Sequence, residues 1–138
     1  MPEVAVETLV PLGPDGAWEA WTRPDRLATW WWPMFPDTVY DLDPRPGGSY
    51  RFETATGGFG ARGDVVAADR PDRLVLTWTW LDHGADDGGP DPVTVTFEPS
   101  GTRTLVRVVH ETAEENRDPY AEGWRDCLAR LGTLVDGS

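Results

Sequence analysis

The chain has 138 residues, of which 24 are acidic and 12 are basic, so its formal net charge is −12 and its isoelectric point is near 4.4. A surface this acidic repels phosphate backbones and anionic lipid, which argues against nucleic-acid and membrane partners. No apolar run reaches the roughly 18 residues of a membrane helix, and no signal peptide is evident. The single cysteine cannot form an internal disulfide, which is typical of a reducing compartment. We therefore expect one cytoplasmic domain over residues 1–138.

The first elements are a strand and two short helices. Residues 3–10 alternate apolar and polar side chains, with Val4, Val6 and Val10 on one face, which is typical of a strand. A first helix follows Gly13, and Pro24 begins a second helical piece that leads into the tryptophans of residues 30–32. Two short helices are therefore expected after the first strand.

From residue 39 to residue 110 the hydrophobic pattern has a period of two, which indicates antiparallel strands with one buried face. Glycine-rich turns separate the runs. The side chains expected to be buried are Phe52, Trp78, Val95, Phe97, Val106 and Val108. Those expected to be exposed are Arg51, Glu53, Thr77, Thr96, Arg103 and Arg107. A slip of one residue would reverse these assignments within any strand.

The chain closes with a helix that should begin near Asp118 and Pro119, an N-cap and a first-turn proline. Its apolar stripe comprises Tyr120, Trp124, Cys127, Leu128, Leu131, Leu134 and Val135. A curved sheet must cover its apolar face, and only this helix is long enough to do so. The predicted class is α+β, with an antiparallel sheet of about six or seven strands around a long C-terminal helix.

Several ordered blocks resemble the heat-shock-protein-90 ATPase activator-homologue family. They are Ala17 to Pro24 (AWEAWTRP) with Leu27 and Trp30-Trp31, Asp43 to Gly48 (DPRPGG), Gly63 to Val65 (GDV), Pro71 to Leu74 (PDRL), Thr77 to Trp80 (TWTW), Thr104 to His110 (TLVRVVH), and Glu122 to Trp124 (EGW) with Leu128 and Leu131. The match covers nearly the whole chain in the family's order. No single block is diagnostic, so the resemblance depends on their combination.

The resemblance implies the helix-grip fold of the START-like superfamily, in which the sheet wraps the C-terminal helix and leaves a cavity. Members include lipid carriers, hormone receptors, polyketide aromatase/cyclases and many small bacterial proteins of unknown role. The fold therefore does not specify a function. In the family's eukaryotic co-chaperones this domain is one part of a longer protein, and we expect a chain of 138 residues to have no room for their additional chaperone-binding domain.

Eight tryptophans are the unusual feature of the composition, and they supply either core or cavity walls. The residues we expect to contact a ligand in the implied cavity are Trp31, Phe52, Trp78, Trp80, Phe97, His110, Tyr120 and Trp124. Trp78 and Trp124 should approach one another. No catalytic or metal-binding set and no cofactor motif is recognised in the sequence.

Three side chains could have a chemical role, and each also has a purely structural interpretation. His110 ends a strand in the buried phase and could orient a ligand, act in proton transfer, or bond to a backbone carbonyl. His83 lies in an acidic loop whose spacing does not fit a calcium site, which favours a solvated hairpin. Cys127 lies on the apolar helix stripe, where a small buried side chain is the expected role.

Three functions are compatible with this sequence. The first is a non-enzymatic protein that binds a small hydrophobic or aromatic molecule, with a homodimer left open. The second is an aromatase/cyclase-like or hydrolase-like enzyme that uses His110. The third is a protein-interaction or chaperone-modulating domain, for which an exposed apolar patch over residues 31–35 would be the sign.

Overall fold

The computed structural model describes residues 2–134. Its strands are β1 (Glu3–Val10), β2 (Val39–Leu42), β3 (Ser49–Thr54), β4 (Phe59–Asp69), β5 (Arg73–Asp82), β6 (Ala85–Asp86), β7 (Asp91–Ser100) and β8 (Arg103–Glu111). Its helices are α1 (Pro14–Thr22), α2 (Pro24–Trp30), a 3-10 turn η1 (Glu114–Asn116) and α3 (Arg117–Leu131). The predicted class and the order of elements are confirmed.

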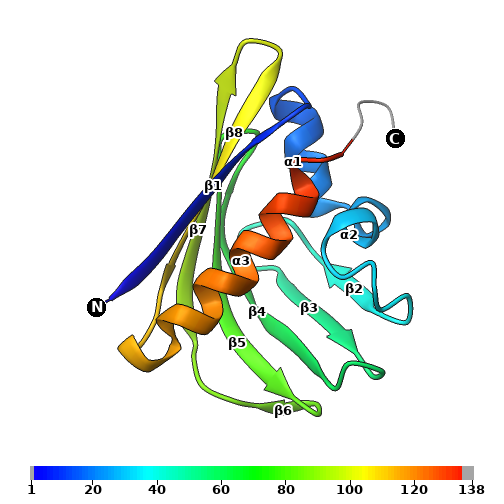
Figure 1. The fold of residues 1–138 in the computed structure, drawn as a ribbon, viewed down its shortest axis with the longest axis vertical. Coiled ribbons are helices and arrows are strands. Elements are labelled where there is room, and N and C mark those ends of the chain that lie inside the picture. The colour runs from blue at the N-terminus through cyan, green and yellow to red at the C-terminus, as the bar shows by residue number, and fades with distance from the viewer. Residues whose placement is uncertain (1, 135–138) are drawn as a thin grey trace.

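The strands form one antiparallel sheet in the order β1-β8-β7-β5-β4-β3-β2, with the two-residue β6 paired to β5. The sheet curves strongly, and α3 crosses its concave face while α1 and α2 close one end (Figure 1). This is the helix-grip arrangement. The sheet has eight strands where about six or seven were expected. The additional strand is β6, whose two residues are too few to show an apolar pattern in the sequence.

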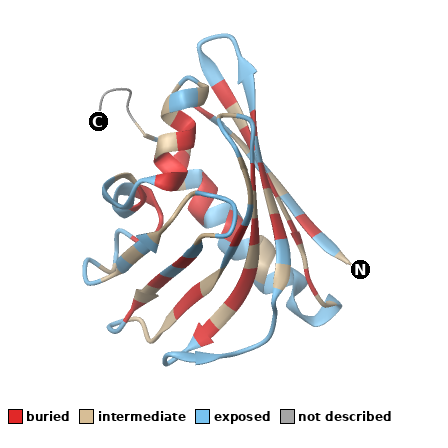
Figure 2. Ribbon diagram, turned by 180° about the vertical axis from the view of Figure 1, so that it is seen from behind, coloured by how far each residue is buried: buried red, intermediate tan, exposed pale blue. Residues whose placement is uncertain are grey.

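The predicted faces of the strands are confirmed for the buried set, in which all six residues are buried. Of the six residues expected outside, four are exposed, while Glu53 and Thr77 are half-buried. The side-chain oxygen of Thr77 accepts a hydrogen bond from the backbone N–H of Asp64, and its carbonyl accepts one from the hydroxyl of Tyr50. These two partners partly cover Thr77. Buried and exposed residues alternate along the strands, as Figure 2 shows.

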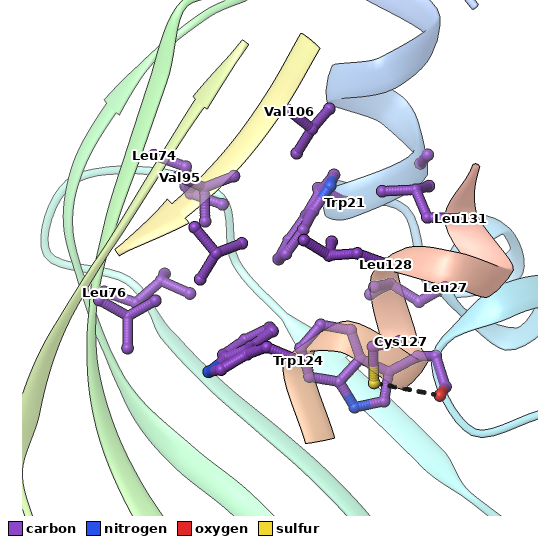
Figure 3. Packing of buried hydrophobic residues seen from close by; sticks show 14 of the residues in the cluster. Trp21, Leu27, Leu74, Leu76, Val95, Val106, Trp124, Cys127, Leu128 and Leu131 are labelled. Carbon is purple, nitrogen blue, oxygen red and sulfur yellow. Dashed lines mark hydrogen bonds between the residues drawn. The ribbon is translucent and has the colours of Figure 1, made fainter. Parts of the chain in front are cut away.

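The C-terminal helix begins at Arg117, slightly earlier than the predicted start at Pro119, because η1 leads directly into it. Trp124, Cys127, Leu128 and Leu131 of the predicted stripe are buried, and Tyr120 and Leu134 are half-buried. Val135 lies outside the described residues. Figure 3 shows four residues of this stripe, Trp124, Cys127, Leu128 and Leu131, on the side of the core opposite the strand side chains Leu74, Leu76 and Val95.

Both short helices begin with proline, which fixes a helical backbone angle where no hydrogen-bond donor is needed. The indole of Trp30 donates to the carbonyl of Ala20 at 2.8 Å and so ties the end of α2 to α1. Arg130 of α3 donates to the carbonyls of Trp30 and Trp31 at 2.8 and 2.6 Å. These contacts hold the residues after α2 against α3. No helix in the described part of the chain is long and apolar enough to cross a membrane.

Candidate functional site

A pocket of about 420 Å³ lies at the concave face of the sheet, beside the first two turns of α3. Its walls come from the segment after α2, the middle of β5, the loop before β7 and one face of α3. The lining residues are Trp31, Trp32, Trp78, Trp80, Asp87, Gly88, Asn116, Pro119, Tyr120, Gly123, Trp124 and Cys127.

Five of the twelve lining residues are tryptophans. The ring centres of Trp78 and Trp124 are 5.2 Å apart, which confirms the predicted approach. Trp31 lies 5.6 Å from Trp124 and 6.2 Å from Trp78, and Trp80 stacks near Trp78 at 6.5 Å. Trp32 meets Trp80 edge to face at 6.3 Å. The indoles therefore pack against one another and still leave a pocket beside them.

Tyr120 places a polar group at the pocket wall. Its hydroxyl accepts a hydrogen bond from the indole N–H of Trp78 at 3.2 Å. Burial raises the pKa of Tyr120 above its usual value, so the hydroxyl stays protonated at neutral pH and keeps a proton to donate.

His110 lies on β8, fully buried behind Tyr120, with ring centres 4.3 Å apart. The indole N–H of Trp124 donates to Nδ1 at 3.1 Å. Nδ1 must therefore be unprotonated, and Nε2 carries the proton that it donates to Asp91 at 2.9 Å. Burial lowers the pKa of His110 in spite of the nearby carboxylate, which agrees with a neutral ring.

Five of the eight residues expected to bind a ligand line the pocket: Trp31, Trp78, Trp80, Tyr120 and Trp124. The other three do not. Phe52 packs behind Trp31 at 5.2 Å, Phe97 packs against Trp18 at 5.6 Å, and His110 is engaged with Trp124 and Asp91. The alternation along a strand predicts which side chains face the concave side of the sheet, but not where along the groove each of them lies.

Other lining residues were not among those expected to contact a ligand. Pro119, Gly123 and Cys127 share a helix face with Tyr120 and Trp124, so spacings of three and four residues would have identified them. Asp87 lies in the loop interpreted as solvated, and it is exposed in the structure, but its backbone N–H donates to the carbonyl of Trp80 at 2.7 Å. That bond holds the loop at the pocket.

The apolar patch considered over residues 31–35 is not present as one surface. Trp31 and Trp32 are buried, and Phe35 packs against Phe59 at 5.4 Å. Met34 is the large apolar side chain of this segment that is exposed, at 53%. The tryptophans of this segment therefore face the pocket and the core.

Comparison with known proteins places this geometry in context. The family model described as "Activator of Hsp90 ATPase homolog 1-like protein" matches residues 12–136. No curated protein sequence matches the chain.

Solved structures share the fold. DynU16, a protein in the dynemicin biosynthetic locus, is 25% identical with a TM-score of 0.76 over 94% of this chain and 45% of its own, so this chain spans less than half of DynU16. CalU16 from Micromonospora echinospora is 25% identical, with a TM-score of 0.73 over 98% of this chain and 76% of its own. The Aha1 dimer from Colwellia psychrerythraea is 17% identical, with a TM-score of 0.73 over 96% and 94%.

Proposed function

The chain belongs to the family of activator of Hsp90 ATPase homolog 1-like proteins, with the START-like helix-grip fold, and from that premise we propose that it binds a small hydrophobic or aromatic molecule in the pocket beside α3. The observation that carries the proposal is the lining. Five of the eight tryptophans of the chain border one pocket of about 420 Å³.

The size and chemistry of the pocket support this function. Small-molecule sites are typically concave, about 300–1,000 Å³, and mostly apolar with a few placed polar groups. Here Tyr120, Asp87 and Asn116 supply polar atoms in a lining that also contains five indoles. Flat aromatic rings favour flat partners, which stack or meet edge to face.

The two other functions gain no specific support. An acid/base role for His110 requires a ring nitrogen that reaches a ligand. Both ring nitrogens are engaged with protein partners, and the ring does not line the pocket. A protein-docking role over residues 31–35 requires exposed apolar rings, whereas Trp31 and Trp32 are buried.

Tryptophan fluorescence during titration with a panel of small aromatic compounds tests the proposal. A ligand in the pocket should change the emission saturably, because it contacts several indoles at once. Trp80→Leu should weaken that response, since half-buried Trp80 lines the pocket. The matched control is Trp18→Leu, because Trp18 packs on Phe97 away from the lining. If no compound gives a saturable change, or if both variants weaken binding equally, the proposal is wrong.

A further inference from the structure

We propose that the pocket selects a cationic ligand, with a protonated amine or quaternary ammonium group joined to a flat apolar body. This inference rests on the proposed function and adds the charge of the ligand. It follows from three features of the described residues: the charges in the lining, a half-buried carboxylate behind the wall, and the indole rings.

The lining offers one carboxylate and no basic side chain. Asp87 is the acid at the edge of the pocket, and none of the arginines lines it. The chain has no lysine. Burial raises the pKa of Tyr120 and raises that of Cys127 to about 11, so both groups are neutral at pH 7. An anionic ligand would lose its hydration without gaining an ionic partner.

Arg130 lies beside this lining, where its guanidinium donates to the sulfur of Cys127 at 3.4 Å. Its guanidinium is already occupied by the carbonyls of Trp30 and Trp31, at 2.8 and 2.6 Å. It therefore stabilises the segment after α2 and does not form part of the pocket wall.

A second carboxylate lies behind the wall. Asp91 has a side chain only 14% exposed and is paired with His110, not with an arginine. Because His110 is held neutral by the hydrogen bond from Trp124, it does not cancel the charge of Asp91. The pKa of Tyr120 is raised first by burial and then by the carboxylates of Asp91 and Asp87. Both carboxylates therefore disfavour a negative charge at the Tyr120 hydroxyl on the pocket wall.

The indoles favour the same sign of charge. The face of an aromatic ring carries negative electrostatic potential and attracts a cation within about 6 Å of its centre, and tryptophan does so best. The ring centre of Trp78 lies 6.2 Å from that of Trp31, 6.5 Å from that of Trp80 and 5.2 Å from that of Trp124. These four indoles share the lining with Trp32. A cation in the pocket would lie at this indole lining, where Trp80 is the most exposed of the five rings, and near the carboxylate of Asp87.

Three phenol derivatives test this inference by calorimetric titration: the trimethylammonium, tert-butyl and carboxylate compounds substituted at the same ring position. The first two have almost the same shape and differ in charge. We expect the trimethylammonium compound to bind about tenfold more tightly than the tert-butyl compound, as a desolvated cation–π contact predicts, and the carboxylate to bind weakest. Equal affinity for the first two, or preference for the tert-butyl or carboxylate compound, would overturn the inference while leaving the proposed function intact. Failure of all three to bind would overturn both.

Asp87→Asn locates the charge effect. Asp87 is exposed, so the substitution should leave the fold intact. It should reduce affinity for the trimethylammonium compound about threefold to tenfold and leave the tert-butyl compound unchanged. The control is Asp118→Asn, which removes the same charge from the exposed first turn of α3 outside the lining. An equal loss in both variants, or an equal loss for both compounds, would contradict a role for Asp87.

Discussion

Gly123→Leu should obstruct the pocket and stabilise the protein at the same time. Gly123 lies in the second turn of α3 at the pocket, and a Cβ built on it meets no atom within 4 Å. A Cβ therefore fits here without displacing any atom, and the rest of a leucine side chain should extend into the opening. Glycine in a helix interior costs about 0.8–1.0 kcal/mol relative to alanine, and leucine is nearly as favourable as alanine. We expect a gain of about 0.8 kcal/mol, or about 2–5 °C in Tm for a domain of this size.

Differential scanning calorimetry and ligand titration measure the two effects separately. Binding should fall at least tenfold in Gly123→Leu while Tm rises. Gly123→Ala is the control, because it gives a similar gain in stability but adds only a methyl group and should retain most of the affinity. Unchanged affinity in Gly123→Leu would refute the location of the site, and a lower Tm would refute the open space beside Gly123.

Three further predictions concern the supports of the pocket. Because burial lowers the pKa of His110, the unfolded chain binds more protons than the folded one below about pH 6.5, and stability should fall as pH drops from 7 to 5. Urea melts at pH 7 and pH 5 should show a smaller loss of unfolding free energy in His110→Gln than in the wild type. The exposed control His83→Gln should lose as much as the wild type. An identical loss in all three proteins would contradict a neutral His110. Arg130→Leu leaves two carbonyls without their charged donor and should lower the free energy of unfolding by about 2–4 kcal/mol. The control Arg125→Leu, at an exposed position, should lower it by less than about 0.5 kcal/mol. Similar urea midpoints for the two variants would contradict this role of Arg130. Burial raises the pKa of Cys127 to about 11, so only about one thousandth of the thiol ionises at pH 8, and alkylation should be far slower than in urea; equal rates would contradict the burial.

Strand faces and helix stripe could be predicted from the sequence because each follows from a local period. Alternation places Phe52, Phe97 and Trp78 on the concave face whatever the strands pair with. The spacing of Trp124, Cys127 and Leu131 likewise fixes the buried side of α3. These patterns are set by the covalent geometry of the backbone and need no tertiary information.

Membership of the pocket could be predicted only in part. Five of the eight expected residues line it, but Phe52, Phe97 and His110 do not, because the position along the groove depends on pairing between distant segments. His110 meets Asp91 because β7 and β8 pair with Val93 opposite His110, which brings the start of β7 beside the end of β8. Trp31 is equally non-local, since the carbonyl of this residue is held by Arg130, 99 residues away. Neither partner leaves a signal in the local sequence.

The central claim is that a small aromatic molecule binds among the indoles beside α3. The most direct test is a two-dimensional NMR titration that follows the indole N–H signals of the eight tryptophans, assigned by substitution. We expect the signals of Trp31, Trp32, Trp78, Trp80 and Trp124 to shift saturably with ligand, and those of Trp18, Trp21 and Trp30, which do not line the pocket, to shift less. Equal shifts in both groups, or larger shifts in the second, would place the ligand elsewhere and contradict the account.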